Sequence, residues 1–317
     1  MKKNAFNLRT AVLSLLLFVI IFVALSWSDL TAHIQADEYG VEFLIGVSQC
    51  NLAEPYRAKM NSDIVQAALA YPNVKVIFTD AAQSNEKQIH DIQYLIDLGI
   101  DLLIVSPNES EPLTDTIAKA YEKIPVIVLD REVSGDDFTL FIGADNYAIG
   151  QQCAQNIIAE LGEQGGNIIE ITGLVGSTPT MLRSNGFHDE ISKHPEFRVI
   201  ASISGDWLRD EAYDEISAWC QDNTDLQIDA IYSHNDPMAL GARWIMDDYG
   251  KNPIIVGIDG LPGEGNGVEM VEHGIIDATC VYPTGGAESI EYALKILNGE
   301  SIEDKYITLP FQNITRP

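Results

Sequence analysis

Charged, amide and aromatic side chains follow directly after several of the short apolar runs in this 317-residue sequence. Asp130 and Asp259 each come at the end of a run of Val, Ile and Leu, and their carboxylates accept hydrogen bonds. Arg131 and Arg183 offer forked donors, which suit two neighbouring hydroxyl groups. An uncharged sugar needs this mixture, since its hydroxyls donate and accept while its C–H faces stack on aromatic rings. The residues of these types are Tyr56, Asp130, Arg131, Arg183, Trp207, Asn235 and Asp259.

No catalytic or metal-binding spacing is present in the sequence. The six histidines match no HExxH pattern, so we expect no metal site, and we expect no cofactor. There is also no GxSxG motif, which would mark a serine nucleophile. Asp130 and Asp259 could serve as the acid and base of a glycosidase. However, Arg131 beside Asp130 favours an ionised carboxylate, which suits hydrogen bonding better than proton donation. We therefore expect a binding protein and no enzyme.

The elements that position these side chains alternate between apolar strands and amphipathic helices. Met60, Ile64 and Ala67, for example, are spaced as on one helix face. The alternation passes a less regular stretch near residues 139–147 and then starts again, which predicts an α/β fold of two doubly wound lobes with parallel sheets. Ligands of such sheets lie beyond the carboxyl ends of the strands. The expected strands are 43–47, 74–78, 102–105, 126–129, 168–171, 199–203, 228–232 and 254–258.

Two helix ends can be read from local signals. Asp236-Pro237 is typical of an N-cap followed by proline at the first helical position. Asn298-Gly299 predicts the end of a helix that carries Ile290 and Leu294.

The N-terminus carries an uncharged, strongly apolar run over residues 10–27, preceded by three basic residues. A helix of this length rises about 27 Å, near the minimum for crossing a bilayer. The basic flank is expected to stay in the cytoplasm, so the rest of the chain is expected outside it. Ala24-Leu25-Ser26 is a passable signal-peptide cleavage site, but the run is long for a signal peptide. We therefore expect an uncleaved anchor and linker over residues 1–36, with a cleaved signal peptide as the alternative.

Charge excludes several other classes of protein. Nineteen Lys and Arg residues against 47 Asp and Glu residues give a net charge of −28. A body this acidic repels phosphate backbones, so we expect no nucleic-acid partner. A transcriptional repressor is also excluded, because the apolar run occupies the place where a helix-turn-helix would be needed.

Four cysteines are spread widely and form no CxxC motif: Cys50, Cys153, Cys220 and Cys280. Export would permit disulfides, but the spacing indicates no connectivity. Their apolar neighbours favour buried free thiols.

Four segments carry a family resemblance: residues 128–131 (VLDR), 183–187 (RSNGF), 234–242 (HNDPMALGA) and 256–260 (VGIDG). In this order they resemble the ribose- and galactofuranose-type periplasmic sugar-binding proteins, over about residues 41–311. The resemblance implies a type I periplasmic binding protein fold with a three-strand hinge, its crossovers near residues 143, 260 and 283. Lobe 1 would then comprise residues 41–143 with 284–311, and lobe 2 residues 144–283.

The resemblance also implies a set of ligand-binding positions. Gln49 and Arg57 are similar to first-loop ligands of the galactofuranose-type proteins. The loop 52–56 is longer than that of ribose binders, Ser106 replaces a common Asn, and Tyr282 replaces an amide, so which sugar is bound stays open. The implied positions are Gln49, Tyr56, Arg57, Ser106, Asp130, Arg131, Arg183, Trp207, Asn235, Asp259 and Tyr282.

Two further segments, 261–267 and 282–286, resemble extracellular sensor modules of sugar-responsive histidine kinases and membrane-anchored sugar-binding proteins that signal through a kinase. The implied ligand is a neutral monosaccharide, a pentose or a hexose. Two membrane partners remain open: a permease of the ABC type, for uptake, or a histidine kinase of a two-component system, for sensing. A further alternative is that the chain is itself the sensor domain of such a kinase.

Overall fold

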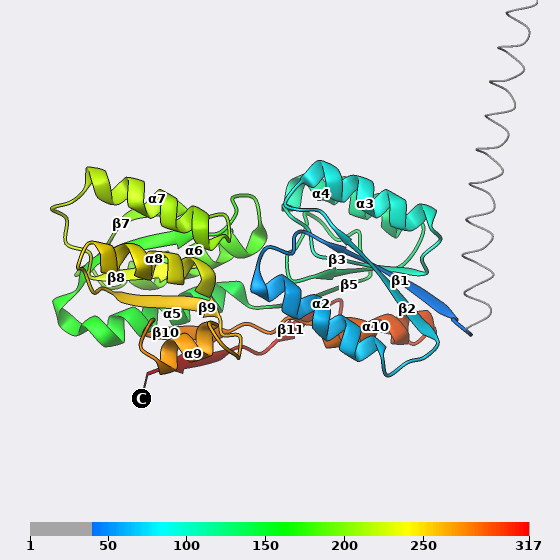
Figure 1. Cartoon of the computed structure of the whole chain (residues 1–317). Helices are drawn as coiled ribbons and strands as arrows, with labels where there is room; N and C mark the ends of the chain where they lie inside the picture. The colour runs from blue at the N-terminus through cyan, green and yellow to red at the C-terminus, as the bar shows by residue number, and fades with distance from the viewer. Residues whose placement is uncertain (1–39, 317) are drawn as a thin grey trace, which may run out of the picture.

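The computed structural model describes residues 40–316, which form two lobes side by side (Figure 1). Within this range no helix is long and apolar enough to cross a membrane. The predicted anchor, residues 10–27, lies outside the described residues.

Each lobe is built on one six-stranded sheet. In lobe 1 all paired strands are parallel, and the order is β11-β5-β4-β3-β1-β2. In lobe 2 the order is β12-β10-β9-β8-β6-β7, and only β12 is antiparallel to its neighbour. The strands of lobe 1 are β1 (Phe43–Gln49), β2 (Val74–Asp80), β3 (Leu102–Val105), β4 (Val126–Leu129), β5 (Leu140–Ala144) and β11 (Tyr306–Leu309). Those of lobe 2 are β6 (Gly166–Thr172), β7 (Phe197–Ser204), β8 (Ala230–Ser233), β9 (Ile254–Asp259), β10 (Ala278–Val281) and β12 (Gln312–Thr315).

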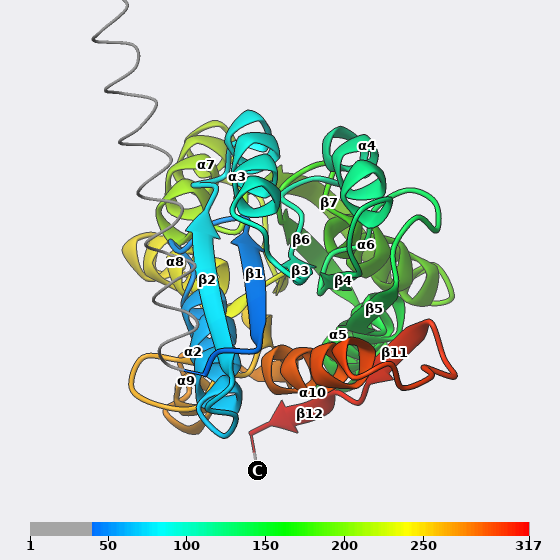
Figure 2. The same ribbon diagram turned by 90° about the vertical axis from the view of Figure 1, so that its right-hand side faces the viewer.

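Helices cover both faces of each sheet, which is why β3 and β4 are buried along their whole length. In lobe 1, α3 and α4 lie on one face and α2 and α10 on the other (Figure 2). The helices of lobe 1 are α2 (Pro55–Ala68), α3 (Asn85–Asp97), α4 (Ser110–Tyr121) and α10 (Gly286–Leu297). Those of lobe 2 are α5 (Asn146–Leu161), α6 (Thr178–Ile191), α7 (Arg209–Asp222), α8 (Asp236–Asp248) and α9 (Gly267–Glu272), with the short 3₁₀ helix η1 (Gly162–Gln164).

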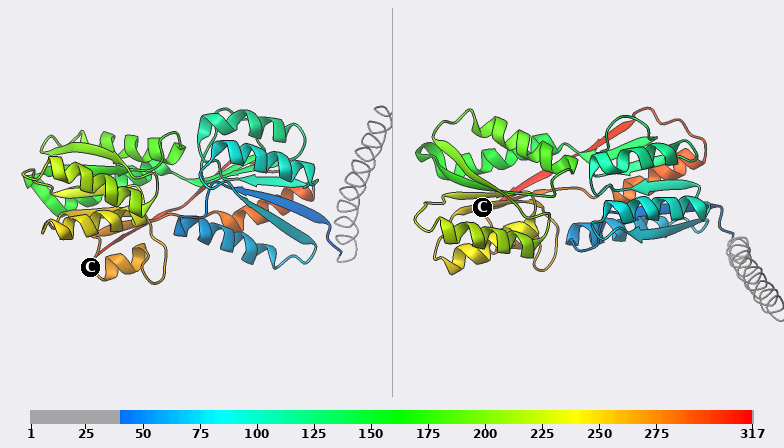
Figure 3. Two further views of the ribbon diagram at one scale, coloured as in Figure 1. Left: turned by 45° about the horizontal axis from the view of Figure 1, so that its top comes forward. Right: turned by 90° about the horizontal axis from the view of Figure 1, so that it is seen from above.

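Between residues 40 and 316 the chain passes from one lobe to the other three times, and the crossing segments can be followed in Figure 3. One crossing joins β5 to α5 and another joins β10 to α10, close to the predicted positions 143 and 283. The predicted crossover near residue 260 is wrong, because β9, α9 and β10 all belong to lobe 2. The third crossing lies instead between β11 and β12, at residues 310–311.

All eight predicted strands are present, and four more were not predicted: β5, β10, β11 and β12. Strand β5 fills the stretch that looked irregular, and all five of its residues are buried. The last two strands are short, and only one of their residues, Leu309, is buried, so they lack the apolar run that identified the others.

Helix α8 begins one residue away from the predicted cap. Asn235 is the N-cap, and its side chain accepts a hydrogen bond from the Met238 N–H at 2.9 Å. Asp236, predicted as the cap, is instead the first helical residue. The predicted end of α10 is confirmed, since Asn298 is its C-cap and Gly299 follows with a φ of 75°.

All four cysteines are buried and free, as expected. Two of them, Cys153 on α5 and Cys280 on β10, place their sulfur atoms 3.9 Å apart in the core of lobe 2.

Candidate ligand-binding site

The carboxyl ends of the two sheets face each other, and ten side chains enclose one buried space there, called the cleft here. They come from the strand ends, the loops that follow them and the N-terminal turns of helices α2 and α6. Eight of these ten were predicted as ligand-binding residues. The cleft is lined by Glu54, Tyr56, Arg57, Asp130, Pro179, Arg183, Trp207, Asn235, Asp259 and Tyr282.

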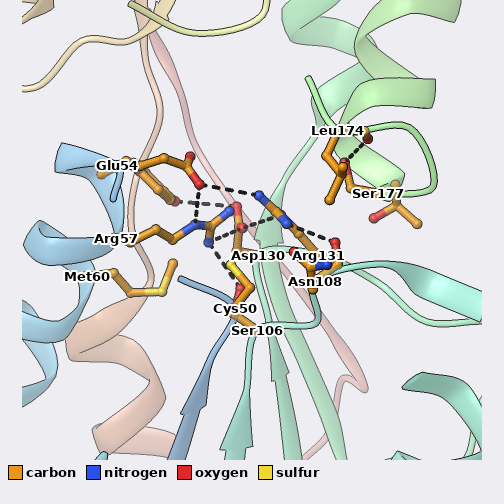
Figure 4. Close-up of polar contacts among 12 residues, drawn as sticks. Cys50, Glu54, Arg57, Met60, Ser106, Asn108, Asp130, Arg131, Leu174 and Ser177 are labelled. Carbon is orange, nitrogen blue, oxygen red and sulfur yellow. Dashed lines mark hydrogen bonds and ion pairs between the residues drawn. The ribbon is translucent and has the colours of Figure 1, made fainter. Parts of the chain in front are cut away.

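On the lobe 1 side, a buried ion pair joins helix α2 to the end of β4 (Figure 4). Helix α2 starts with Pro55 in its first turn, and this places Tyr56 and Arg57 on its buried face. Arg57 Nη1 lies 2.6 Å from Asp130 Oδ2 and donates to Ser106 Oγ at 3.1 Å. Asp130 has a φ of 71°, a strained backbone position that turns its carboxylate into the cleft.

The Asp130 carboxylate is held ionised. Burial by itself would raise its pKa, but the positive charges of Arg57 and Arg131 and the hydrogen bond from Arg57 outweigh burial and lower the pKa below its ordinary value. Asp130 is therefore a fixed hydrogen-bond acceptor at neutral pH and a poor proton donor.

Arg131 and Trp207 meet across the two lobes. The Arg131 guanidinium lies 5.4 Å from the centre of the Trp207 ring, within cation–π range. Arg131 Nη1 donates to the backbone carbonyl of Asn108 at 2.9 Å, while Nη2 lies 3.7 Å from Glu54 (Figure 4). Trp207 has a φ of 72°, and the Asn235 amide donates to its carbonyl at 3.0 Å. The ring is therefore held by lobe 2 against the guanidinium of lobe 1.

On the lobe 2 side, Arg183 lies between two aromatic rings. Its guanidinium is 5.3 Å from the ring centre of Trp207 and 4.7 Å from that of Tyr282. Its Nε donates to Asn146 Oδ1 at 2.8 Å, and Nη1 donates to the His234 carbonyl. These contacts fix the plane of the guanidinium, which is the requirement for recognising two adjacent oxygens.

Asp259 is the second carboxylate of the cleft, and its chemistry differs from that of Asp130. It is 5 % exposed, its φ is 126°, and no hydrogen bond to its side chain is present among the described residues. Burial and the neighbouring Asp236 raise its pKa well above the ordinary value, against the opposing charge of Arg183. A buried carboxyl in this state is ready to hydrogen-bond a ligand hydroxyl.

Buried donors without partners gather in the cleft. Across residues 40–316, six buried side-chain nitrogen or oxygen atoms lack a hydrogen-bond partner. Two of the six belong to residues that line the cleft, Arg57 Nε and Trp207 Nε1, and two more belong to Arg131 directly behind it, Nε and Nη2. Because orphaned buried donors are costly, this concentration indicates that acceptor oxygens of a ligand belong here.

Three predicted residues do not line the cleft. Arg131 stands just behind it, against Glu54 and Trp207. Ser106 is reached only through Arg57. The Gln49 amide points elsewhere and donates to Asn61 Oδ1 at 3.0 Å.

Glu54 and Pro179 line the cleft but were not predicted. Glu54 Oε1 lies 3.7 Å from the guanidinium nitrogens of both Arg57 and Arg131. Its spacing of three residues from Arg57 at a helix start is a signal that the sequence does contain. Pro179 gives no chemical signal.

The lobes are closed in this structure. Hydrogen bonds join them directly, from Ser110 N to the Gly176 carbonyl at 2.9 Å and from Glu132 N to Thr178 Oγ1 at 2.8 Å. The space left inside the cleft is about 10 Å³, roughly the room of one water molecule. Entry of a ligand therefore requires the lobes to separate, and a ligand larger than water requires the cleft side chains to rearrange around it when the lobes close again.

The chemistry of the site is hydrogen bonding and ring stacking. In the part of the chain that the structure describes, no three His, Cys, Asp or Glu side chains lie where they could hold a metal ion.

Comparison with known proteins agrees with this geometry. A family model described as a periplasmic binding protein domain matches residues 45–301. The ribose import binding protein of Salmonella typhimurium is 31% identical over 235 residues, which are 73% of this chain and 77% of that protein. Its counterpart in Bacillus subtilis is 28% identical over 274 residues, or 86% and 87% of the two chains.

Solved structures give the same answer. The fructose-binding periplasmic domain of a hybrid two-component system superimposes with a TM-score of 0.83 at 40% identity, covering 87% of this chain and 91% of that one. The periplasmic component of an arabinose ABC transporter from Shewanella sp. ANA-3 gives 0.80 at 25% identity, covering 86% and 91%. The expected resemblance is thus confirmed, and the chain belongs to the periplasmic binding protein family, among relatives that bind sugars.

Proposed function

We propose that this protein is an extracytoplasmic receptor for a neutral monosaccharide, which it holds in the cleft. One observation carries the proposal: carboxylates, guanidinium groups and aromatic rings from both lobes converge on a single buried space. Fixed acceptors, forked donors and ring faces together match the hydroxyls and C–H faces of a sugar. The named ligands of its relatives, ribose, fructose and arabinofuranose, support an uncharged sugar.

Binding is proposed to proceed by hinge closure. The moving units are residues 41–143 with 284–311 and residues 144–283, the latter together with β12 (Gln312–Thr315), and the crossing segments connect them. The sugar enters the open form, contacts both sets of side chains, and so stabilises the closed form.

The closed form is proposed to be recognised by a membrane protein. A histidine kinase is favoured, because the fructose-binding domain of a two-component system is 40% identical, against 31% for the ribose import binding protein. A permease of the ABC type is the alternative, as in the arabinose transporter relative. Neighbouring reading frames distinguish the two: a kinase gene supports sensing, and permease with ATPase genes support uptake.

Membrane attachment is proposed through residues 10–27, with the folded body outside the cytoplasmic membrane. N-terminal sequencing of the membrane fraction tests the attachment. Recovery of Met1 in that fraction supports an uncleaved anchor, whereas a new N-terminus after Ser26 supports a cleaved signal peptide.

No catalysis is proposed, because an ionised Asp130 is unsuited to donate a proton. Incubation with fructosides, ribosides and arabinosides tests this. Released sugar that disappears in Asp259→Asn would overturn the binding-protein interpretation.

The binding proposal itself is tested by calorimetry of the full-length chain with D-fructose, D-ribose and L-arabinose. Micromolar one-to-one binding of at least one sugar is expected. Absence of binding to all of them, with the protein folded, contradicts the proposal.

A further inference from the structure

A second cavity adjoins the cleft and shares three of its wall residues, Glu54, Trp207 and Asp259. Its volume is about 460 Å³, within the range of small-molecule sites. We call this cavity the side chamber. The side chamber is larger than the cleft, and a single sugar ring held in the cleft would not occupy it.

Both lobes build the side chamber. Lobe 1 supplies Ala53 and Pro55 from the start of α2, and lobe 2 supplies Leu240 of α8 and the segment after β9. The chamber is therefore complete only when the lobes are closed. A group held there adds contacts to the closed form, as a sugar in the cleft does.

The lining combines buried apolar side chains, buried carboxyl groups and exposed charged side chains: Glu54, Asp236 and Asp259 are buried walls of the chamber. Leu261 and Met270 are 9 % and 2 % exposed and form apolar wall together with Leu240. Arg209, Asp210 and Glu211, at the start of α7, are exposed side chains of the rim. Apolar wall beside carboxyl groups suits a second sugar ring, whose C–H face packs on the apolar side chains while its hydroxyls bond to the carboxyl groups and the rim.

Trp207 and Asp259 connect the two spaces chemically. Both line the cleft and the side chamber, and the buried Trp207 Nε1 has no hydrogen-bond partner. The two spaces therefore border each other at these residues, and a ligand held by both would extend past Trp207 and Asp259.

We infer that the ligand is a sugar ring carrying a second group, a glycoside or a disaccharide, with its first ring in the cleft and the second group in the side chamber. This inference rests on the proposed sugar-binding function and adds the class of sugar to it.

The test compares sugars and variants by calorimetry on the full-length chain. The sugars are D-fructose, D-ribose and L-arabinose, each with its methyl furanoside and a disaccharide that carries the same sugar at its non-reducing end. Leu240→Trp and Ala53→Trp narrow the chamber from opposite walls. Leu226→Trp and Ala70→Trp place the same bulk at exposed positions that line neither space.

At least one disaccharide is expected to bind as tightly as its monosaccharide or more tightly. Both chamber variants should lower the ratio of disaccharide to monosaccharide affinity at least tenfold, and both control variants should leave the ratio within twofold.

Three results overturn the inference. If monosaccharides bind and no disaccharide or methyl furanoside does, the chamber is no subsite, while the proposed function stands. If the chamber variants weaken both kinds of sugar equally, a single ring occupies the chamber. If no sugar of the set binds to folded protein, the inference and the proposed function fall together. Thermal melting of each variant shows that it is folded.

Discussion

Arg57 Nη1 lies 2.6 Å from Asp130 Oδ2, although 73 residues separate the two in the chain and both side chains are buried. This pair links the first turn of α2 to the end of β4, and so holds the loop before α2 at the cleft. Removing one partner of this pair is expected to cost more stability than removing both, because the remaining partner is then an uncompensated buried charge.

Asp130→Ala and Arg57→Ala are each expected to lower the free energy of unfolding by about 3–5 kcal/mol, since each leaves the other charge buried and unpaired. The double variant should lose less than the sum of the two, which urea titration measures. Lys59→Ala is the control on the same helix; its partly exposed pair with Asp63 predicts a loss of about 0.5 kcal/mol. If the double variant loses as much free energy of unfolding as the two single variants together, Arg57 and Asp130 are not energetically coupled.

Arg183→Ala and Asp259→Ala are each expected to weaken sugar binding by about 2–4 kcal/mol. Arg183→Ala leaves Asn146 Oδ1 and the His234 carbonyl without their donor, and Asp259→Ala leaves a buried ligand hydroxyl without a partner. Calorimetry with the sugar that binds wild type measures the loss. Arg198→Ala removes an exposed arginine of lobe 2 and should leave affinity unchanged. Wild-type affinity in both cleft variants would remove Arg183 and Asp259 from the binding site.

Gly173→Ala is expected to weaken sugar binding through Trp207. A Cβ at position 173 would lie 2.2 Å from the indole ring, so the ring must move. Trp207→Ala should also weaken binding, but by less than Arg183→Ala, because the ring contributes stacking and one N–H. In the Trp207→Ala background, Gly173→Ala should have no further effect on affinity. A full additional loss there would mean that Gly173 acts by another route.

Stability should depend on pH through Asp236. Burial raises the pKa of its carboxyl from 3.8 to about 7, against hydrogen bonds from Thr279 and the Gly260 N–H. Because the folded form holds this proton more tightly than the unfolded form, the stabilisation is fully present below about pH 4 and is lost as the pH rises through about 7.

Asp236→Asn removes this titration and keeps a similar shape. Its melting temperature relative to wild type should therefore be higher at pH 8 than at pH 5, as thermal melting at the two pH values measures. Asp222→Asn, an exposed position of α7, should show no such difference. If the melting temperature of Asp236→Asn differs from that of wild type by the same amount at both pH values, the raised pKa of Asp236 is wrong.

Most of the framework could be predicted because it depends on local pattern. Buried parallel strands are continuous apolar runs, and the residues after them must lie at one sheet edge, which located Asp130 and Asp259. Strands β11 and β12 escaped prediction because almost all of their residues remain partly or fully exposed. The misplaced crossover near residue 260 has a related cause, since the true third crossing joins these two strands.

Which side chains enter the cleft depends on contacts that no local pattern contains. Gln49 ends a buried strand as the other candidates do, yet Asn61 of α2 takes its amide away from the cleft. Glu54 enters because two arginines from different elements surround it. Both outcomes follow from how α2 packs on the sheet, which is a tertiary property.

If both lobes hold one uncharged sugar, binding must close the lobes, so binding and closure are best measured together. Small-angle scattering of the full-length chain in detergent, with and without the sugar identified by calorimetry, follows the radius of gyration of wild type and Arg183→Ala. We predict that sugar makes wild type more compact, with half the change at the calorimetric dissociation constant, and that the variant does not respond at the same concentration. Sugar binding of equal affinity in both proteins, with no change in compactness, would contradict this prediction.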